Sequence, residues 1–190
     1  EIKSRKGTVI FDTDEHPNDK INMEGLAKMQ PVFKKGGKIT AGNASSINDG
    51  AVALIIMAGD KAKELGLKPL ARIVATASAS VDPKIMGIGV VPAVRRVLKF
   101  AQMSMDDIEL WEINEAFAAQ VIACNRELQV DVNKINVLGS GISLGHPVGM
   151  TGARLVLTLM NEMRRSKKQF GCAALCAGGG PAMATIIEAL

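Results

Sequence analysis

Hydrophobic residues are spaced differently in the two parts of this chain. Residues 1–48 are rich in charged and turn-forming residues, and their pattern predicts one short helix at 24–30. From about residue 68 onward, short apolar runs alternate with segments of helical periodicity. In residues 92–101, apolar side chains recur at intervals of three and four, which favours an amphipathic helix. The second part therefore predicts an α/β layered domain.

Further segments of the same kinds predict the remaining strands and helices. Strands are expected at residues 52–57, 70–76, 108–113, 135–138, 171–176 and 183–189. Helices are expected at residues 60–67, 92–101, 115–128 and 152–165. Residues 52–57 are apolar without interruption, which is typical of a strand covered on both faces. Only a short glycine-rich turn separates the last two strands, so we expect them to be antiparallel.

The composition fits a globular protein of one or two domains. The 190 residues are 47% hydrophobic and 3% aromatic, so the core is expected to consist of Ala, Val, Ile, Leu and Met. The net charge of +4 lies partly in two basic clusters, at residues 34–38 and 164–168. Neither cluster is interleaved with aromatic residues, which argues against nucleic-acid binding. A site for an anionic small molecule and a solvated surface both stay open.

The cysteines and the apolar runs exclude other classes of protein. Cys124, Cys172 and Cys176 lack the paired spacing of a zinc site, so no metal is expected, and their odd number favours a reducing, cytoplasmic setting. No apolar run approaches the roughly 20 residues that a membrane helix needs, so no membrane association is predicted. The sequence begins at Glu1 with a polar stretch, from which we expect a chain that starts inside a longer protein.

Candidate chemistry lies at the ends of predicted elements, where active-site groups tend to be found. Asn114 follows a strand and opens a helix, so it is either an N-cap or an amide that holds a water or a carbonyl oxygen. His146 lies in a glycine-rich loop, residues 139–149, and is either a structural or a catalytic histidine.

Two other segments carry weaker signals. Cys176 ends an apolar strand just before three glycines, so it is a candidate acid or base beside backbone N–H groups that can bind an oxyanion. The alternative is a buried, inert thiol, which is the interpretation we favour for Cys124 and Cys172. The small residues at 40–46 form either the wall of a groove for a long, thin ligand or simply a turn.

Five strings of residues together resemble the thiolase family, in the family's order and spacing and over essentially the whole chain. They are Thr-Ala-Gly-Asn-Ala-Ser at 40–45, Val-Asp-Pro-Lys-Ile-Met-Gly at 81–87, Asn-Glu-Ala-Phe-Ala-Ala-Gln at 114–120, Gly-His-Pro-Val-Gly at 145–149 and Cys-Ala-Gly-Gly-Gly at 176–180. The glycine pair that the family usually carries before its histidine motif is Gly139-Ser140 here.

The resemblance implies a fold and a reaction. It implies an α/β, thiolase-like layered fold whose C-terminal domain has a mixed β-sheet between helical layers. Residues 1–47 would be the end of the loop domain, 48–67 the last piece of the N-terminal domain and 68–190 the C-terminal domain. The implied activity is that of an acetyl-CoA C-acetyltransferase, which condenses two acetyl-CoA molecules to acetoacetyl-CoA in a Claisen condensation, or runs the reverse thiolysis.

The same resemblance implies roles for individual residues. His146 would activate a nucleophilic cysteine and donate to a thioester oxygen, and Asn114 would hold the water that completes this first oxyanion hole. Cys176 would move the substrate's α-proton, and the Gly178 N–H would contribute to a second oxyanion hole. The family's acyl-accepting cysteine lies in its N-terminal half and has no match here, so the chain alone is expected to be inactive.

Substrate contacts and partners follow from the resemblance in the same way. Ser45 and Ala41 would line the pantetheine channel, and Phe117 and Met86 would shape the acyl pocket. No cofactor is implied beyond coenzyme A as part of the substrate. The implied partners are acyl-CoA substrates, the N-terminal half of the thiolase and, in the full-length enzyme, further copies in a homo-oligomer. Two alternatives stay open: a 3-ketoacyl-CoA thiolase of fatty-acid β-oxidation, and a non-catalytic fragment that binds CoA or a partner.

Overall fold

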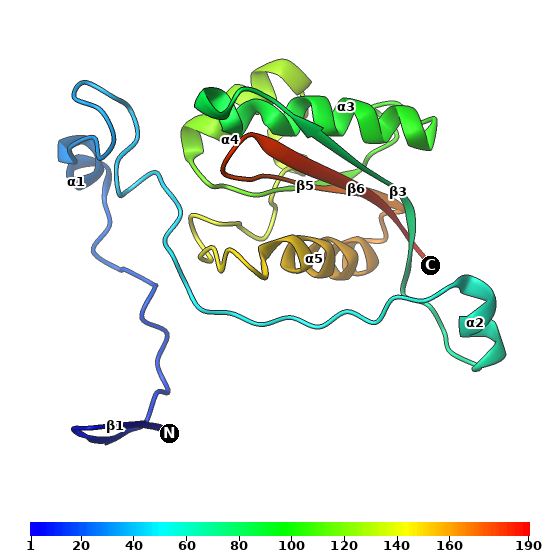
Figure 1. The fold of residues 1–190 in the computed structure, drawn as a ribbon, viewed down its shortest axis with the longest axis horizontal. Coiled ribbons are helices and arrows are strands. Elements are labelled where there is room, and N and C mark those ends of the chain that lie inside the picture. Colours follow the sequence, from blue (N-terminus) through cyan, green and yellow to red (C-terminus); the bar gives the residue numbers. More distant parts are fainter.

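A four-stranded mixed sheet forms the centre of the molecule in the computed structural model, which describes residues 1–190 (Figure 1). The strand order is β3 (Ala71–Ser80), β6 (Pro181–Ala189), β5 (Phe170–Cys176) and β4 (Leu110–Ile113). β4 and β5 are parallel, whereas β6 is antiparallel to both of its neighbours. The predicted antiparallel arrangement of the last two strands is therefore confirmed.

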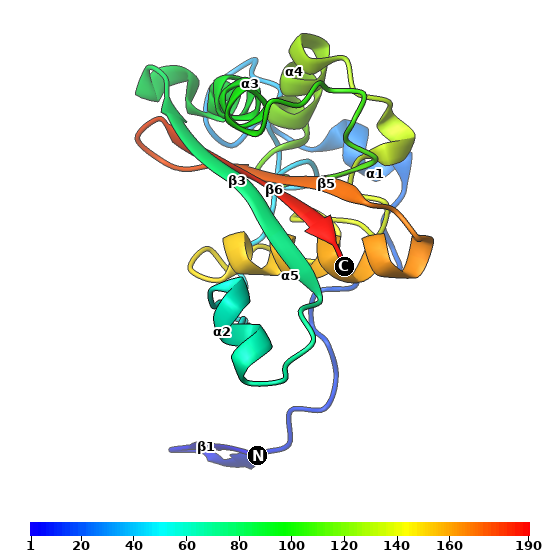
Figure 2. The same cartoon turned by 90° about the vertical axis from the view of Figure 1, so that its right-hand side faces the viewer.

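Helices cover both faces of this sheet, as Figure 2 shows. α3 (Val90–Ala101) packs on β3 and β6, and α4 (Ala118–Leu128) lies on the same side of the sheet. α5 (Thr151–Ser166) packs on β4 and β5 from the opposite side. The α/β class, with a mixed sheet between helical layers, is confirmed.

The periodicity of α3 explains how it seals the larger core. Val94 and Val97 are completely buried on the face that meets the sheet, whereas Arg95 and Arg96 are exposed on the opposite face. The helix ends at Gln102, whose left-handed backbone terminates it. On the other side of the sheet, Leu155 and Leu159 of α5 contribute a smaller core. Aliphatic side chains dominate both cores, as the composition predicts.

The first 67 residues contain little regular structure. β1 (Ile2–Ser4) and β2 (Gly7–Val9) form an exposed antiparallel pair, and α1 (Met23–Lys28) is the predicted short helix. An extended segment then runs beneath α5 to α2 (Gly59–Glu64) (Figure 1). No helix of the chain combines the length and the apolar character required to cross a membrane.

Two of the predicted strands are wrong. Residues 52–57 are extended but belong to no sheet, and Ile55 and Ile56 are 89% and 70% exposed because no strand of this chain lies beside them. Residues 135–138 form only a single bridge, between Ile135 and Trp111, because the chain turns away after a short 3₁₀ helix, η2 (Val132–Lys134).

Helix α4 begins later than the sequence pattern predicts. Its N-terminal cap is Phe117, and Asn114 lies three residues earlier in a non-helical segment. The interpretation of Asn114 as an N-cap is therefore wrong, and its side chain is free for other contacts. A second 3₁₀ helix, η1 (Pro83–Gly89), leads directly into α3 and carries Met86.

Candidate active site

The candidate site lies where the two parallel strands end. Ile113 of β4 is paired with Ala174 of β5, and the Asn114 N–H donates to the Ala174 carbonyl at 2.9 Å. Cys176 is the last residue of β5, two positions further on. The carboxyl ends of parallel strands lie on the same side of a sheet, so Asn114 and Cys176 lie on the same side, which we call the sheet edge.

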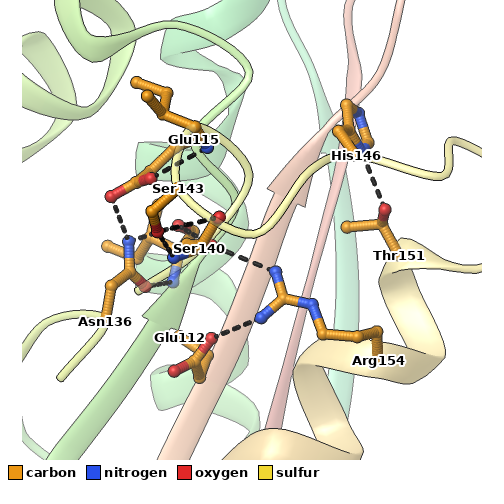
Figure 3. Close-up of polar contacts among 10 residues, drawn as sticks. Glu112, Glu115, Asn136, Ser140, Ser143, His146, Thr151 and Arg154 are labelled. Atoms are coloured by element: carbon orange, nitrogen blue, oxygen red, sulfur yellow. Dashed lines mark hydrogen bonds and ion pairs between the residues drawn. The ribbon is translucent and has the colours of Figure 1, made fainter. Parts of the chain in front are cut away.

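Hydrogen bonds hold the glycine loop, residues 139–149, beside this edge. The Ile142 N–H donates to the Glu115 carboxylate at 3.1 Å, and the Ser140 hydroxyl donates to the Ile113 carbonyl at 3.4 Å. Figure 3 shows these contacts around Glu115 and Ser140. They place His146, near the end of the loop, opposite Asn114.

The protonation of the His146 ring follows from its partners. The Thr151 hydroxyl donates to the Pro147 carbonyl at 2.9 Å, so it must accept from the His146 Nδ1–H at 2.6 Å. The hydrogen therefore sits on Nδ1, and Nε2 keeps its lone pair. Nε2 lies 3.3 Å from the Asn114 amide nitrogen, which donates to it. The basic nitrogen of His146 thus points at the sheet edge.

Asn114 is completely buried, and its Oδ1 has no hydrogen-bond partner within the chain. A buried amide oxygen without a partner is costly, and such atoms recur where a ligand or a water binds. Gly141 lies against this oxygen, since a Cβ at that position would be only 2.9 Å from it. The Asn114 side chain therefore offers both a donor, to His146, and an unused acceptor.

A buried ion pair lies near His146 (Figure 3). The Arg154 guanidinium donates to the Glu112 carboxylate at 3.0 Å and to the Ser140 hydroxyl at 3.1 Å. Burial raises the pKa of Glu112 to about 7, because it outweighs the attraction of Arg154. Burial and the positive charge of Arg154 lower the pKa of His146 and keep its imidazole neutral. A neutral imidazole is the form that can accept a proton.

Cys176 and the glycines after it form the other part of the site. Cys176 is buried, and burial raises the pKa of its thiol. The Gly178 N–H makes no hydrogen bond within the chain, and the space that a Cβ would occupy at Gly178 is open. A free backbone N–H next to open space is suited to binding an oxyanion.

The expected substrate-contacting residues are only partly brought together. Ser45 donates its N–H and its hydroxyl to the Ala116 carbonyl, at 3.0 and 3.2 Å, which places it next to Phe117. Phe117 and Met86 pack against one core cluster, to which Cys176 also belongs. Ala41 is exposed in the turn that precedes Ser45. Ser45 therefore lies beside Phe117, Phe117 and Met86 pack on the same cluster as Cys176, and Ala41 stays exposed.

The structure also identifies residues that the sequence analysis missed. Thr151 and Arg154 lie in the first turn of α5 and support His146, but no local pattern distinguishes them from other residues that begin a helix. Cys124 and Cys172 are buried, and burial raises the pKa of their thiols to about 11 and about 12, in keeping with the inert interpretation. The charged side chains of both basic clusters are exposed, as in a solvated surface.

Comparison with known proteins identifies the family. The model of the thiolase C-terminal domain matches residues 67–189, and that of the thiolase N-terminal domain matches residues 1–60. This chain belongs to the thiolase family. The domain boundaries expected at residues 47 and 67 stay a prediction.

Individual relatives agree with this assignment. Acetyl-CoA acetyltransferase from Syntrophomonas wolfei is 52% identical over 100% of this chain and 48% of its own length. The enzyme of the same name from Pseudomonas aeruginosa is 52% identical over 97% of this chain and 47% of its own length. The chain therefore spans about half the length of the curated relatives that it matches.

Solved structures give the same picture. The Bacillus anthracis acetyl-CoA acetyltransferase matches 100% of this chain and 48% of its own, with a TM-score of 0.93 and 53% identity. Human mitochondrial 3-ketoacyl-CoA thiolase matches 99% of this chain and 48% of its own, with a TM-score of 0.91 and 45% identity. Both enzymes thus share this fold over nearly all of its length.

Proposed function

We propose that this chain supplies the acid/base and oxyanion-binding part of an acetyl-CoA acetyltransferase. The observation that carries the proposal is the His146 ring, whose basic Nε2 faces Asn114 at the sheet edge where Cys176 also lies. This edge holds a proton acceptor, a thiol and free hydrogen-bonding groups. A reaction that forms and breaks thioesters needs groups of these kinds.

The first half-reaction uses His146. Its Nε2 takes the proton from the thiol of an acyl-accepting cysteine, and the thiolate attacks the carbonyl carbon of acetyl-CoA. The departing CoA thiolate takes that proton back from His146, which leaves an acetyl group on the cysteine. The lowered pKa of His146 supports this role, because the imidazole must be neutral to begin the step.

The second half-reaction uses Cys176. Its thiol passes a proton to the neutral Nε2 of His146, and the resulting thiolate removes an α-proton from a second acetyl-CoA. The enolate carbon then attacks the acetyl group on the nucleophile. The enolate oxygen is held by the Nε2–H of the protonated His146 and by a water on the unused Asn114 oxygen, and the Gly178 N–H stabilises the oxyanion of the attacked acetyl group. Collapse of that intermediate releases acetoacetyl-CoA and the nucleophile as a thiolate, which takes the proton from His146. This Claisen step breaks a C–H bond and forms a C–C bond.

The nucleophilic cysteine must come from a partner half, because no cysteine of this chain takes that role. The segment at residues 47–57 is suited to binding such a partner, since Ile47, Ile55 and Ile56 are 92%, 89% and 70% exposed. Exposed apolar residues of this kind drive association. The three cysteines of the chain are free, which fits a reducing compartment such as the cytoplasm.

Reconstitution tests the proposal. Chain 1–190 is mixed with the complementary half of an acetyl-CoA acetyltransferase, and thiolysis of acetoacetyl-CoA is followed by the loss of its enolate absorbance. The mixture is expected to be active and each half alone inactive. Activity of chain 1–190 alone, or no activity in a mixture that associates, would contradict the proposal.

A second candidate is a 3-ketoacyl-CoA thiolase that acts on longer chains, which the TM-score of 0.91 to the human mitochondrial enzyme favours. The reconstituted enzyme separates the two candidates when 3-ketoacyl-CoA substrates of increasing length are compared. A kcat/KM that is highest for acetoacetyl-CoA supports the first candidate, and one that rises with chain length supports the second.

A further inference from the structure

The second histidine of the chain is connected to the glycine loop through an unbroken set of hydrogen bonds. His16 lies in the N-terminal segment, far from His146 in the sequence, and is partly buried. Its Nε2 is 3.2 Å from the Ile142 carbonyl, and its Nδ1 is 3.1 Å from the Ser46 hydroxyl. The His16 ring therefore contacts both the glycine loop, at Ile142, and the segment before β3, at Ser46.

The connection continues from Ser46 to the backbone of His146. The Ser46 hydroxyl donates to Asn48 Oδ1 at 2.6 Å, and the His146 N–H donates to the same oxygen at 3.1 Å. Gly145 permits this approach, because a Cβ there would lie 2.6 Å from the Asn48 side chain and the φ of Gly145 is +97°. We call His16, Ser46 and Asn48 the clamp.

The direction of each hydrogen bond follows from the acceptors. Asn48 Oδ1 and the Ile142 carbonyl can only accept. The Ser46 hydroxyl therefore donates to Asn48 Oδ1, and the Ile142 carbonyl accepts from His16 Nε2, while His16 Nδ1 lies against the Ser46 hydroxyl. Asp14, Asp49 and Arg154 line the same cavity of about 220 Å³ as His16, so two carboxylates and one guanidinium face it.

We propose that His16 is a positioning residue that, together with Ser46 and Asn48, fixes the glycine loop at two points, Ile142 and His146. The clamp holds the backbone of His146, whereas Thr151 orients its ring. The importance of this position for catalysis rests on the proposed function, but the clamp itself is a property of the folded chain.

Amide hydrogen exchange of chain 1–190 tests the clamp without any substrate, so that a failure of the clamp is distinguishable from a failure of the proposed function. We expect His16→Phe and Ser46→Ala each to lower the protection of the His146 amide about fivefold, as the loss of one net hydrogen bond predicts. The double variant should lose no more than either single variant. The control, Lys20→Ala, changes an exposed side chain on the same segment and should leave the protection unchanged.

The amides of β5 serve as an internal reference for global stability, and they should keep their protection in every variant. Unchanged protection of the His146 amide in His16→Phe would overturn the proposal, and so would losses that simply add in the double variant.

Discussion

Replacing Arg154 by methionine should destabilise the chain in a way that depends on pH. Glu112 is 2% exposed, and Arg154 is the cation bonded to it, at 3.0 Å. Methionine fills a similar volume but leaves a buried carboxylate without a counter-charge. Breaking a buried pair in this way typically costs about 3–5 kcal/mol. We therefore expect Arg154→Met to lose about this much free energy of unfolding at pH 8.

The pH dependence follows from the raised pKa of Glu112. Its pKa rises from an ordinary 4.5 to about 7 in the folded chain, so the folded state holds this proton more tightly than the unfolded state. The contribution of Glu112 to the free energy of unfolding is fully present below pH 4.5. It is lost as the pH rises to 7, by about 3 kcal/mol in all. Without Arg154, the pKa of Glu112 rises further and the loss continues above pH 7. The wild type stops losing stability near pH 7, so the loss caused by the substitution should be smaller at pH 5 than at pH 8 by up to about 1.4 kcal/mol, the equivalent of one pH unit.

Urea unfolding at pH 5 and pH 8 measures this effect. Trp111 is the only tryptophan and is 2% exposed, so its fluorescence reports unfolding of the core. Glu112→Gln combined with Arg154→Met is the matched control, since it removes both charges and should recover most of the stability at pH 8. An equal loss at the two pH values, or a double variant as unstable as Arg154→Met at pH 8, would refute the reasoning.

Two further predictions concern Thr151 and the turn before β6. Thr151→Val leaves the buried Nδ1–H of His146 without an acceptor, which should lower kcat of the reconstituted enzyme about tenfold to a hundredfold with little change in KM, whereas Thr151→Ser should retain most of the activity. If valine and serine gave equal rates, the tautomer argument would be wrong. Gly180→Ala should cost about 3 kcal/mol or more by thermal unfolding, because φ is +104° and the new Cβ would lie 2.2 Å from the Val81 carbonyl oxygen. Gly178→Ala, with no atom within 4 Å of the added carbon, should cost far less, and equal losses would contradict this account.

The sheet and its covering helices could be predicted because their signals are local. The spacing of apolar residues in α3 matches the face that it buries, with Val94 and Val97 completely covered. Residues 52–57 carry the apolar signal of a buried strand, yet a strand needs a neighbour and this chain supplies none there. The wrong prediction at residues 135–138 has a similar cause, since that segment makes a single bridge and then turns away.

The sequence predicted those site residues whose side chain alone suggests a chemical role and that stand at the end of a strand or in a glycine-rich loop. Asn114, His146 and Cys176 fall into this group, although the later start of α4 changes Asn114 from a capping residue to a partner of His146. The supporting contacts could not be predicted. His16 reaches Ile142 across 126 positions of the sequence, and such a pairing is defined only once the chain has folded.

The division of labour between His146 and Cys176 is the central claim, and separating the two half-reactions tests it most directly. In the reconstituted enzyme, transfer of a labelled acetyl group from acetyl-CoA to the protein measures the first half-reaction, and formation of acetoacetyl-CoA measures the second. We predict that Cys176→Ala keeps the acetyl transfer but loses condensation by at least about a hundredfold. His146→Ala should lose both, whereas the control Cys172→Ala should keep both. Condensation by Cys176→Ala at the unmodified rate, or normal acetyl transfer by His146→Ala, would contradict the account.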